Sequence, residues 1–164
     1  MTSFFIGFSK PKNHPFPLIS WLIQWVEGKE FSHVYTKWQA KDGEYYIFDV
    51  RPPMSRIVSA DEFYQVAEPV KEFEIGCTTA KLDELIYECF SSCGISYGWL
   101  ELIGIGFSKF FRFLGFKSKN PITDKNTIFC TEANYRIYQK LKIMDLQKRP
   151  EDVTLSDIFK KLDK

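Results

Sequence analysis

Histidine is scarce in this chain: His14 and His33 are the only two among 164 residues. Any mechanism that needs an imidazole base or ligand therefore has two candidates. His14 stands between Asn13 and Pro15, a setting typical of a solvent-facing loop, which favours His33. Cysteine is also sparse, and the four cysteines form no CxxC pair and no cysteine–histidine cluster with zinc spacing. The sequence predicts no metal site and no other cofactor.

The chain carries no large excess of positive or negative charge. Lysine and arginine together number 22 and the acidic residues 21, so the formal net charge is +1. Nucleic-acid-binding domains usually carry a broad excess of positive charge, and we therefore expect no nucleic-acid partner. A length of 164 residues is close to that of one ordinary domain, which predicts a single domain over residues 1–164.

Long apolar runs and secretory features are missing as well. No uninterrupted apolar run reaches the ~18–20 residues needed to span a bilayer, so we expect no transmembrane segment. The N-terminal stretch MTSFFIGF lacks the charged start, the long apolar core and the cleavage site of a signal peptide. We therefore expect the protein to be cytoplasmic as synthesised, with reduced thiols.

Strand patterns and helix patterns alternate along the chain, which predicts an α+β fold. Residues 3–8 are typical of a short buried strand and residues 9–15 of a turn. Residues 31–38 and 44–50 predict a β-hairpin around a turn at 41–43. A further strand is expected within 66–75. Apolar periodicity and capping residues predict helices over 18–28, from Ser59, from Thr78 or Thr79 to about 93, over 98–114, over 130–141, and from Thr154 or Ser156.

The hairpin brings a histidine and an acid together. If its turn centres near Lys41, His33 faces Asp49 across the ladder, and both side chains leave the same side of the sheet. A slip of one residue would place them on opposite sides. A salt bridge with the nearby Arg51 is an alternative explanation for Asp49.

Of the four cysteines, Cys130 is the one expected to react. Cys77 precedes a helix cap, and Cys89 and Cys93 lie one turn apart on the apolar stripe of a predicted helix. Cys130 falls where a helix is expected to begin, and the amide groups there favour a thiolate, whereas apolar burial disfavours one. A cysteine nucleophile also needs an imidazole and a polar group that holds the ring, and the hairpin pair supplies both. A buried structural thiol is the alternative interpretation of this cysteine taken alone.

Four stretches carry a family resemblance: LISWLIQWVEG at 18–28 with FSHV at 31–34, YIFDV at 46–50, YGWLELIG at 97–104 and FCTE at 129–132. In this order they resemble the opening, the acid-bearing strand, a segment usually beginning Tyr-Asp and the Cys-Ser-Glu nucleophile motif of the YiiX-like, circularly permuted NlpC/P60 family of papain-like cysteine hydrolases. Together they span nearly the whole chain. Two positions depart from the family pattern, since Asp49 stands where Glu is more common and Gly98 replaces the usual Asp.

The resemblance implies a permuted papain-like fold: an antiparallel sheet flanked by helices, with the nucleophile at a helix N-terminus. It also implies hydrolysis or transfer at a peptide-type amide, as in peptidoglycan stem peptides, or at an acyl ester in lipid-acting relatives. Cys130 would attack the acyl carbon, His33 would take and return the proton, and Asp49 would orient the ring. The Cys130 N–H is the natural oxyanion donor and Tyr97 a candidate second donor. Glu132 would fall in the first helical turn, where the macrodipole favours a carboxylate.

Two alternatives to an amidase or peptidase stay open. Residues 102–123 contain no acid and mix basic residues with phenylalanines, which suits either peripheral contact with an anionic lipid surface or a core helix ending in a basic loop. If these phenylalanines line a groove beside Cys130, an acyl-lipid hydrolase or acyltransferase is favoured; if they are core, a peptide substrate is. The departures at Asp49 and Gly98 motivate the other alternative, a catalytically inactive binding module.

Overall fold

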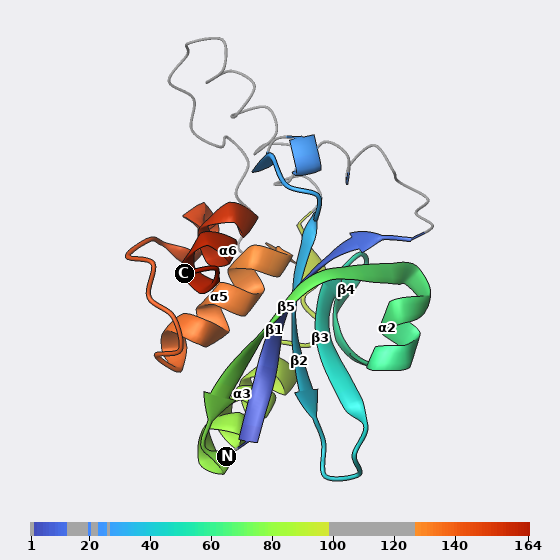
Figure 1. Ribbon diagram of the computed structural model, residues 1–164, viewed down its shortest axis with the longest axis vertical. Helices are drawn as coiled ribbons and strands as arrows, with labels where there is room; N and C mark the ends of the chain where they lie inside the picture. The colour runs from blue at the N-terminus through green and yellow to red at the C-terminus, as the bar shows by residue number, and fades with distance from the viewer. Residues whose placement is uncertain (1, 13–19, 21–22, 26, 99–126) are drawn as a thin grey trace.

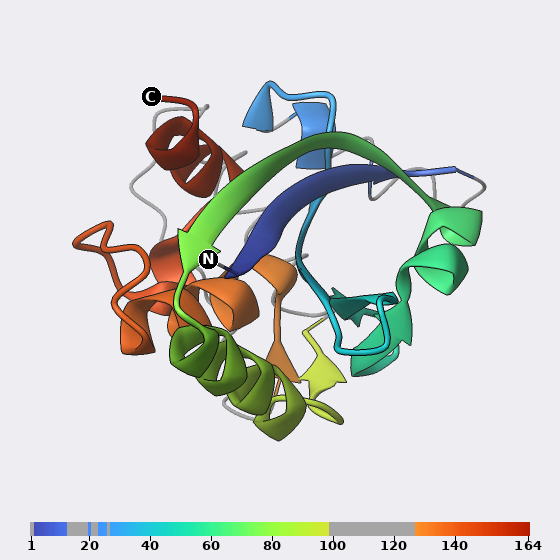
Figure 2. The same cartoon turned by 60° about the horizontal axis from the view of Figure 1, so that its bottom comes forward.

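The computed structural model describes residues 2–12, 20, 23–25, 27–98 and 127–164. They form an α+β fold in which one mostly antiparallel sheet curls into a half-barrel and helices pack around it (Figures 1 and 2). The predicted α+β class and the antiparallel sheet flanked by helices are therefore confirmed. The helix predicted over 98–114 falls almost entirely outside the described residues, as does about half of the helix predicted over 18–28.

Seven strands of the described residues make the sheet, in the order β5-β1-β2-β3-β4-β6-β7. Neighbouring strands pair antiparallel except β6 and β7, which pair parallel. The first strand is longer than predicted, because residues 9–11 continue its ladder with β5 instead of turning. The strands are β1 Thr2–Pro11, β2 His33–Gln39, β3 Tyr45–Arg51, β4 Met54–Ser59, β5 Ala67–Cys77, β6 Ser96–Tyr97 and β7 Thr127–Ile128.

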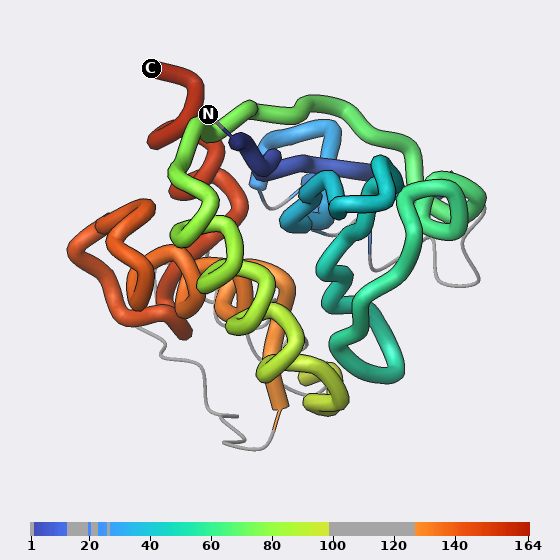
Figure 3. Tube along the Cα trace, turned by 90° about the horizontal axis from the view of Figure 1, so that it is seen from below, coloured from blue at the N-terminus to red at the C-terminus, as the bar shows by residue number. Residues whose placement is uncertain are grey.

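Helices pack on both faces of the sheet. They are α2 Ala60–Val66, α3 Thr79–Ser91, α5 Cys130–Lys140, the 3-10 helix η1 Pro150–Asp152 and α6 Leu155–Leu162. Side chains of Ser59, Thr78 and Thr154 cap α2, α3 and α6, which confirms these three predicted helix starts. The main core lies between the sheet and α3, α5 and α6, with α3 beside α5 (Figure 3). A smaller cluster packs on the opposite sheet face around Phe63 of α2.

The hairpin forms as predicted, but its register differs by two residues. Thr36 pairs with Phe48, so the next pair toward the start of β2 places Asp49 opposite Tyr35. The predicted direct opposition of His33 and Asp49 is therefore wrong. The turn centres one residue later than expected, because its glycine is the residue that adopts a positive φ. Since a shift of two residues preserves the face, His33 and Asp49 still leave the same side of the sheet as diagonal neighbours.

Gly7 lies where the ring of Tyr35 crosses β1. The two residues pair across β1 and β2, and a Cβ added to Gly7 would lie 2.1 Å from the ring Cζ. The ring passes here to donate its hydroxyl to Glu72 Oε1 on β5, at 2.6 Å. We expect Gly7→Ala to lower the free energy of unfolding by about 1–3 kcal/mol, measured by urea denaturation, because the buried ring must move. Gly76→Ala on β5, whose added Cβ would meet nothing within 4 Å, is the matched control. Equal losses in the two variants would contradict this explanation.

Candidate functional site

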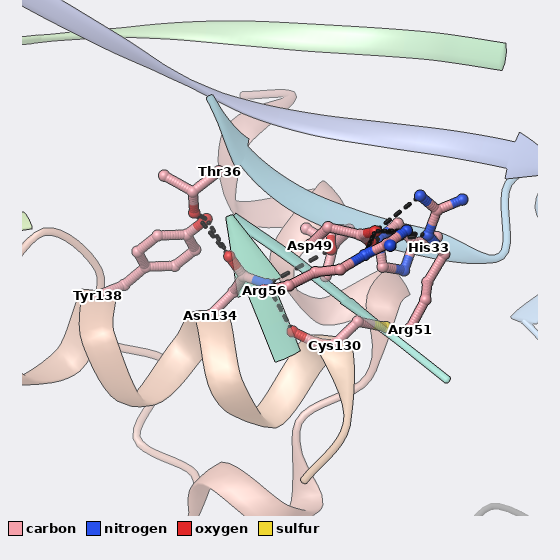
Figure 4. Close-up of polar contacts among 9 residues, drawn as sticks. His33, Thr36, Asp49, Arg51, Arg56, Cys130, Asn134 and Tyr138 are labelled. Atoms are coloured by element: carbon pink, nitrogen blue, oxygen red, sulfur yellow. Dashed lines mark hydrogen bonds and ion pairs between the residues drawn. The ribbon is translucent and has the colours of Figure 1, made fainter. Parts of the chain in front are cut away.

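Three elements bring a thiol, an imidazole and a carboxylate together (Figure 4). Cys130 is the first residue of α5, His33 is the first residue of β2, and Asp49 lies on β3. All three side chains are buried, that of Asp49 completely. His33 Nε2 lies 3.1 Å from Asp49 Oδ1, and the ring also interacts electrostatically with the Cys130 thiol. The structure thus places side by side the three residues predicted to be catalytic.

The start of α5 gives Cys130 its chemical setting. The preceding residue, Phe129, is the N-cap and has extended backbone with no side-chain capping hydrogen bond. Cys130 therefore opens a helix whose first N–H groups have no intrahelical acceptors. Such amide groups carry partial positive charge and can donate to an oxyanion formed beside the thiol.

Asp49 is held chiefly by arginine. Arg51 donates Nε to both carboxylate oxygens, at 2.7 and 2.9 Å, and Nη2 to Oδ2 at 2.7 Å. Arg56 on β4 lies further away, with two nitrogens 3.4 Å from Oδ2. His33 Nε2 is within ion-pair distance, but its N–H is not aligned for a hydrogen bond. Both explanations considered for Asp49 therefore hold: it forms the salt bridge with Arg51 and it also contacts the imidazole.

These contacts shift the pKa values of His33 and Asp49 in opposite directions. Burial acts to lower the pKa of His33, but the contacts with Asp49 and Cys130 outweigh it and raise that pKa above its ordinary 6.5. Burial acts to raise the pKa of Asp49, but His33 and Arg51 hold it far below its ordinary 3.8. A charged carboxylate therefore faces the ring and stabilises its protonated form. An aspartate, one methylene shorter than glutamate, reaches the imidazole here.

The raised pKa of His33 predicts that this residue stabilises the fold more at low than at high pH. A group whose folded pKa exceeds its unfolded value contributes fully below the unfolded value, here 6.5, and loses that contribution as pH rises through the folded value. We expect the difference in unfolding free energy between the wild type and His33→Gln to be larger at about pH 6 than at about pH 9, measured by urea denaturation. A difference independent of pH would contradict this expectation.

The two remaining sequence candidates have different surroundings. Tyr97, on β6, lies near Cys130 and Asp49; burial and these two groups raise the pKa of its hydroxyl, which therefore stays protonated and able to donate. Glu132 is buried in the first turn of α5, and its Oε1 accepts a hydrogen bond from Arg136 Nη2 at 2.5 Å. A carboxylate at this position suits the helix macrodipole.

The other cysteines lack this setting. Cys89 is fully buried in the core, and Cys93 directs its Sγ to the Cys89 carbonyl at 3.3 Å. Burial raises the pKa of both thiols, which disfavours their reactive thiolate form. Cys77 ends β5 just before the N-cap of α3 and contacts the Thr2 hydroxyl at 3.9 Å. Among the described cysteines, Cys130 is the one with an imidazole contact.

The polar residues behind this site are not among those predicted from the sequence. Asn134, one helical turn after Cys130, donates to the Cys130 carbonyl at 2.8 Å and accepts from the Thr36 hydroxyl at 2.6 Å. Tyr138 adds a contact with Thr36 at 2.6 Å. The four-residue spacing from the expected nucleophile was an available signal for Asn134. No comparable signal pointed to Arg56, because the sequence patterns do not indicate strand β4.

Further observations bear on cofactors, membranes and relatives. Among the described residues, no group of three or more His, Cys, Asp and Glu side chains is arranged to hold a metal ion. No helix in the described part of the chain is long and apolar enough to cross a membrane. The basic and aromatic segment 102–123 lies outside the described residues.

No family model matches the chain, and no curated protein matches its sequence.

Proposed function

We propose that this protein is a cysteine hydrolase, an amidase or peptidase with a permuted papain-like fold that acts on a peptide-type amide such as a cell-wall peptide. The observation that carries the proposal is that Cys130, at the start of α5, lies in one buried site with His33 and with Asp49, which is 3.1 Å from the same ring (Figure 4). A thiol at a helix start, an imidazole in contact with it and a carboxylate next to that imidazole are the parts that covalent acyl transfer requires.

The proposed reaction uses these groups in order. The Cys130 thiol gives its proton to His33, and the thiolate attacks the acyl carbon. The carbon–nitrogen bond breaks, the leaving amine takes the proton from His33, and a thioester remains on Cys130. Water, deprotonated by His33, then hydrolyses the thioester and restores the thiol. The Cys130 N–H and the Tyr97 hydroxyl are the proposed donors to the oxyanion, and Asp49 keeps the ring oriented.

Alkylation by iodoacetamide tests the proposal. The thiolate is the reacting form, so a thiol paired with imidazole should be alkylated at about pH 6 faster than Cys77 in the same molecule. Peptide mass spectrometry distinguishes the two sites. His33→Ala should remove the excess rate at Cys130. If Cys130 reacts no faster than Cys77, and His33→Ala changes nothing, the proposed function is wrong.

A second assay separates the substrate classes. Cleavage of muropeptides that is lost in Cys130→Ala supports the amidase or peptidase. Release of fatty acid from phospholipid vesicles, lost in the same variant, indicates instead an acyl-lipid hydrolase or acyltransferase on the same site. Fast, His33-dependent alkylation without turnover of either substrate indicates a binding module that retains the site.

A further inference from the structure

A buried chain of hydrogen bonds joins the start of α5 to β2, the strand that begins with His33 (Figure 4). Asn134 Nδ2 donates to the carbonyl of Cys130 at 2.8 Å. The same nitrogen lies 3.4 Å from the carbonyl of Val34, the residue next to His33. Asn134 Oδ1 accepts from the Thr36 hydroxyl at 2.6 Å. One side chain therefore contacts the backbone of the expected nucleophile and two positions on the strand of the expected base.

Because these hydrogen bonds are buried, they restrict how α5 can lie against β2. Asn134, Thr36 and Tyr138 are all fully buried. A buried donor or acceptor that loses its partner costs about 1–3 kcal/mol. Sliding α5 along β2 would leave several such groups without partners at once, so the relative position of the two elements is strongly restricted. A carboxamide suits this position because it donates and accepts at the same time, which a carboxylate cannot do.

We infer that Asn134 is a positioning residue: it fixes the start of α5 against β2 so that the Cys130 thiol stays in contact with His33. The inference rests on the proposed function, in which that contact activates the nucleophile. Asn134 itself touches no reacting atom and acts through the backbone of Cys130 and through β2. Displacing a reacting group by about 1 Å can lower a rate by about 10²-fold, so a modest shift of α5 has a large effect.

The test measures alkylation of Cys130 by iodoacetamide against pH in three variants. Asn134→Ala removes the link, and we expect the rate at about pH 6 to fall about 10–100-fold, with a pH profile approaching that of His33→Ala. Thr36→Val removes the hydroxyl bonded to Asn134 Oδ1, and we expect a smaller fall in the same direction. Tyr138→Phe is the matched control. It removes a buried hydroxyl and its long 3.3 Å hydrogen bond to Asn134 Oδ1, but it leaves the contacts of Asn134 with Cys130, Val34 and Thr36, and we expect a profile close to that of the wild type.

The outcomes separate this inference from the proposed function. A wild-type profile for Asn134→Ala, with fast His33-dependent alkylation in the wild type, overturns the inference alone. An equal fall in Tyr138→Phe also overturns it, because the effect would then reflect general loosening of the core. Thermal unfolding shows whether each variant is folded. If Asn134→Ala does not fold, the alkylation profile of Thr36→Val tests the inference in its place. If Cys130 in the wild type shows no dependence on His33, the proposed function fails and the inference fails with it.

Discussion

Replacing Asp49 by alanine should lower the free energy of unfolding by about 3–5 kcal/mol, the loss expected when one partner of a buried ion pair is removed. The Asp49 carboxylate has no exposed surface and is in contact with Arg51, Arg56 and His33. The guanidinium of Arg51 also lies over the ring of Phe63, 4.7 Å from its centre, and its side chain is largely buried. Without Asp49, that positive charge would stay in a mostly apolar setting with no other acidic partner among the residues that the structure describes.

Glu62→Ala is the matched control for this change. Glu62 also pairs with Arg56, at 3.7 Å, but its side chain is exposed, and exposed pairs contribute about 0–1 kcal/mol. Urea denaturation of both variants measures the difference. If Glu62→Ala costs as much as Asp49→Ala, burial of the charge is not the cause.

Asp49→Asn separates the charge from the shape of the side chain. A carboxylate whose folded pKa is depressed contributes stability above its unfolded value, here 3.8, and loses it as pH falls through the folded value. The stability gap between the wild type and Asp49→Asn should therefore be wide at neutral pH and shrink in acid. At neutral pH Cys130 in the variant should also be alkylated about 10²-fold more slowly than in the wild type, since no carboxylate would then stabilise the imidazolium that forms when His33 takes the proton of the thiol. A gap that persists unchanged in strong acid would contradict the charge argument.

Local signals account for the parts of the fold that the sequence predicts. Ser59, Thr78 and Thr154 mark helix starts because a hydroxyl can satisfy an orphan N–H within the same few residues. The two-residue period of a strand correctly predicts that His33 and Asp49 share a face. Their direct opposition is wrong because register depends on which turn residue takes the positive φ, and the pattern of apolar residues does not specify it.

The parts of the fold and of the site that could not be predicted depend on contacts between segments far apart in the sequence. Thr36 and Asn134 are 98 residues apart, and each alone resembles an ordinary polar residue on an otherwise apolar face. Strand β4 begins just after Pro52-Pro53 and carries Ser55 and Arg56, so it lacks the apolar alternation of a typical strand. Its place in the sheet follows from pairing with β3, where Arg56 stands opposite Asp49. Pairing of this kind depends on the assembled sheet and not on the local sequence.

The largest effect on activity is expected from Cys130→Ala, assayed with p-nitrophenyl acetate. In the proposed reaction the thiolate attacks the acetyl carbon, p-nitrophenolate leaves, and water then hydrolyses the acetyl thioester on Cys130. The alanine side chain carries no nucleophile, so release of p-nitrophenolate by the variant should fall about 10³-fold or more. Loss of one buried sulfur atom at the start of α5 leaves the rest of the site in place, and circular dichroism checks that the variant is folded.

Cys77→Ala is the informative comparison, because Cys77 is also a thiol close to a helix start. It stands immediately before Thr78, the N-cap of α3, as Cys130 stands immediately after Phe129, the N-cap of α5. If amide groups at a helix start were sufficient for reactivity, the two substitutions would have comparable effects. The contact that distinguishes Cys130 is the one with His33. Wild-type turnover in Cys77→Ala together with loss in Cys130→Ala would therefore assign the reactivity to the thiol–imidazole pair, whereas turnover retained in Cys130→Ala would rule that pair out as its source.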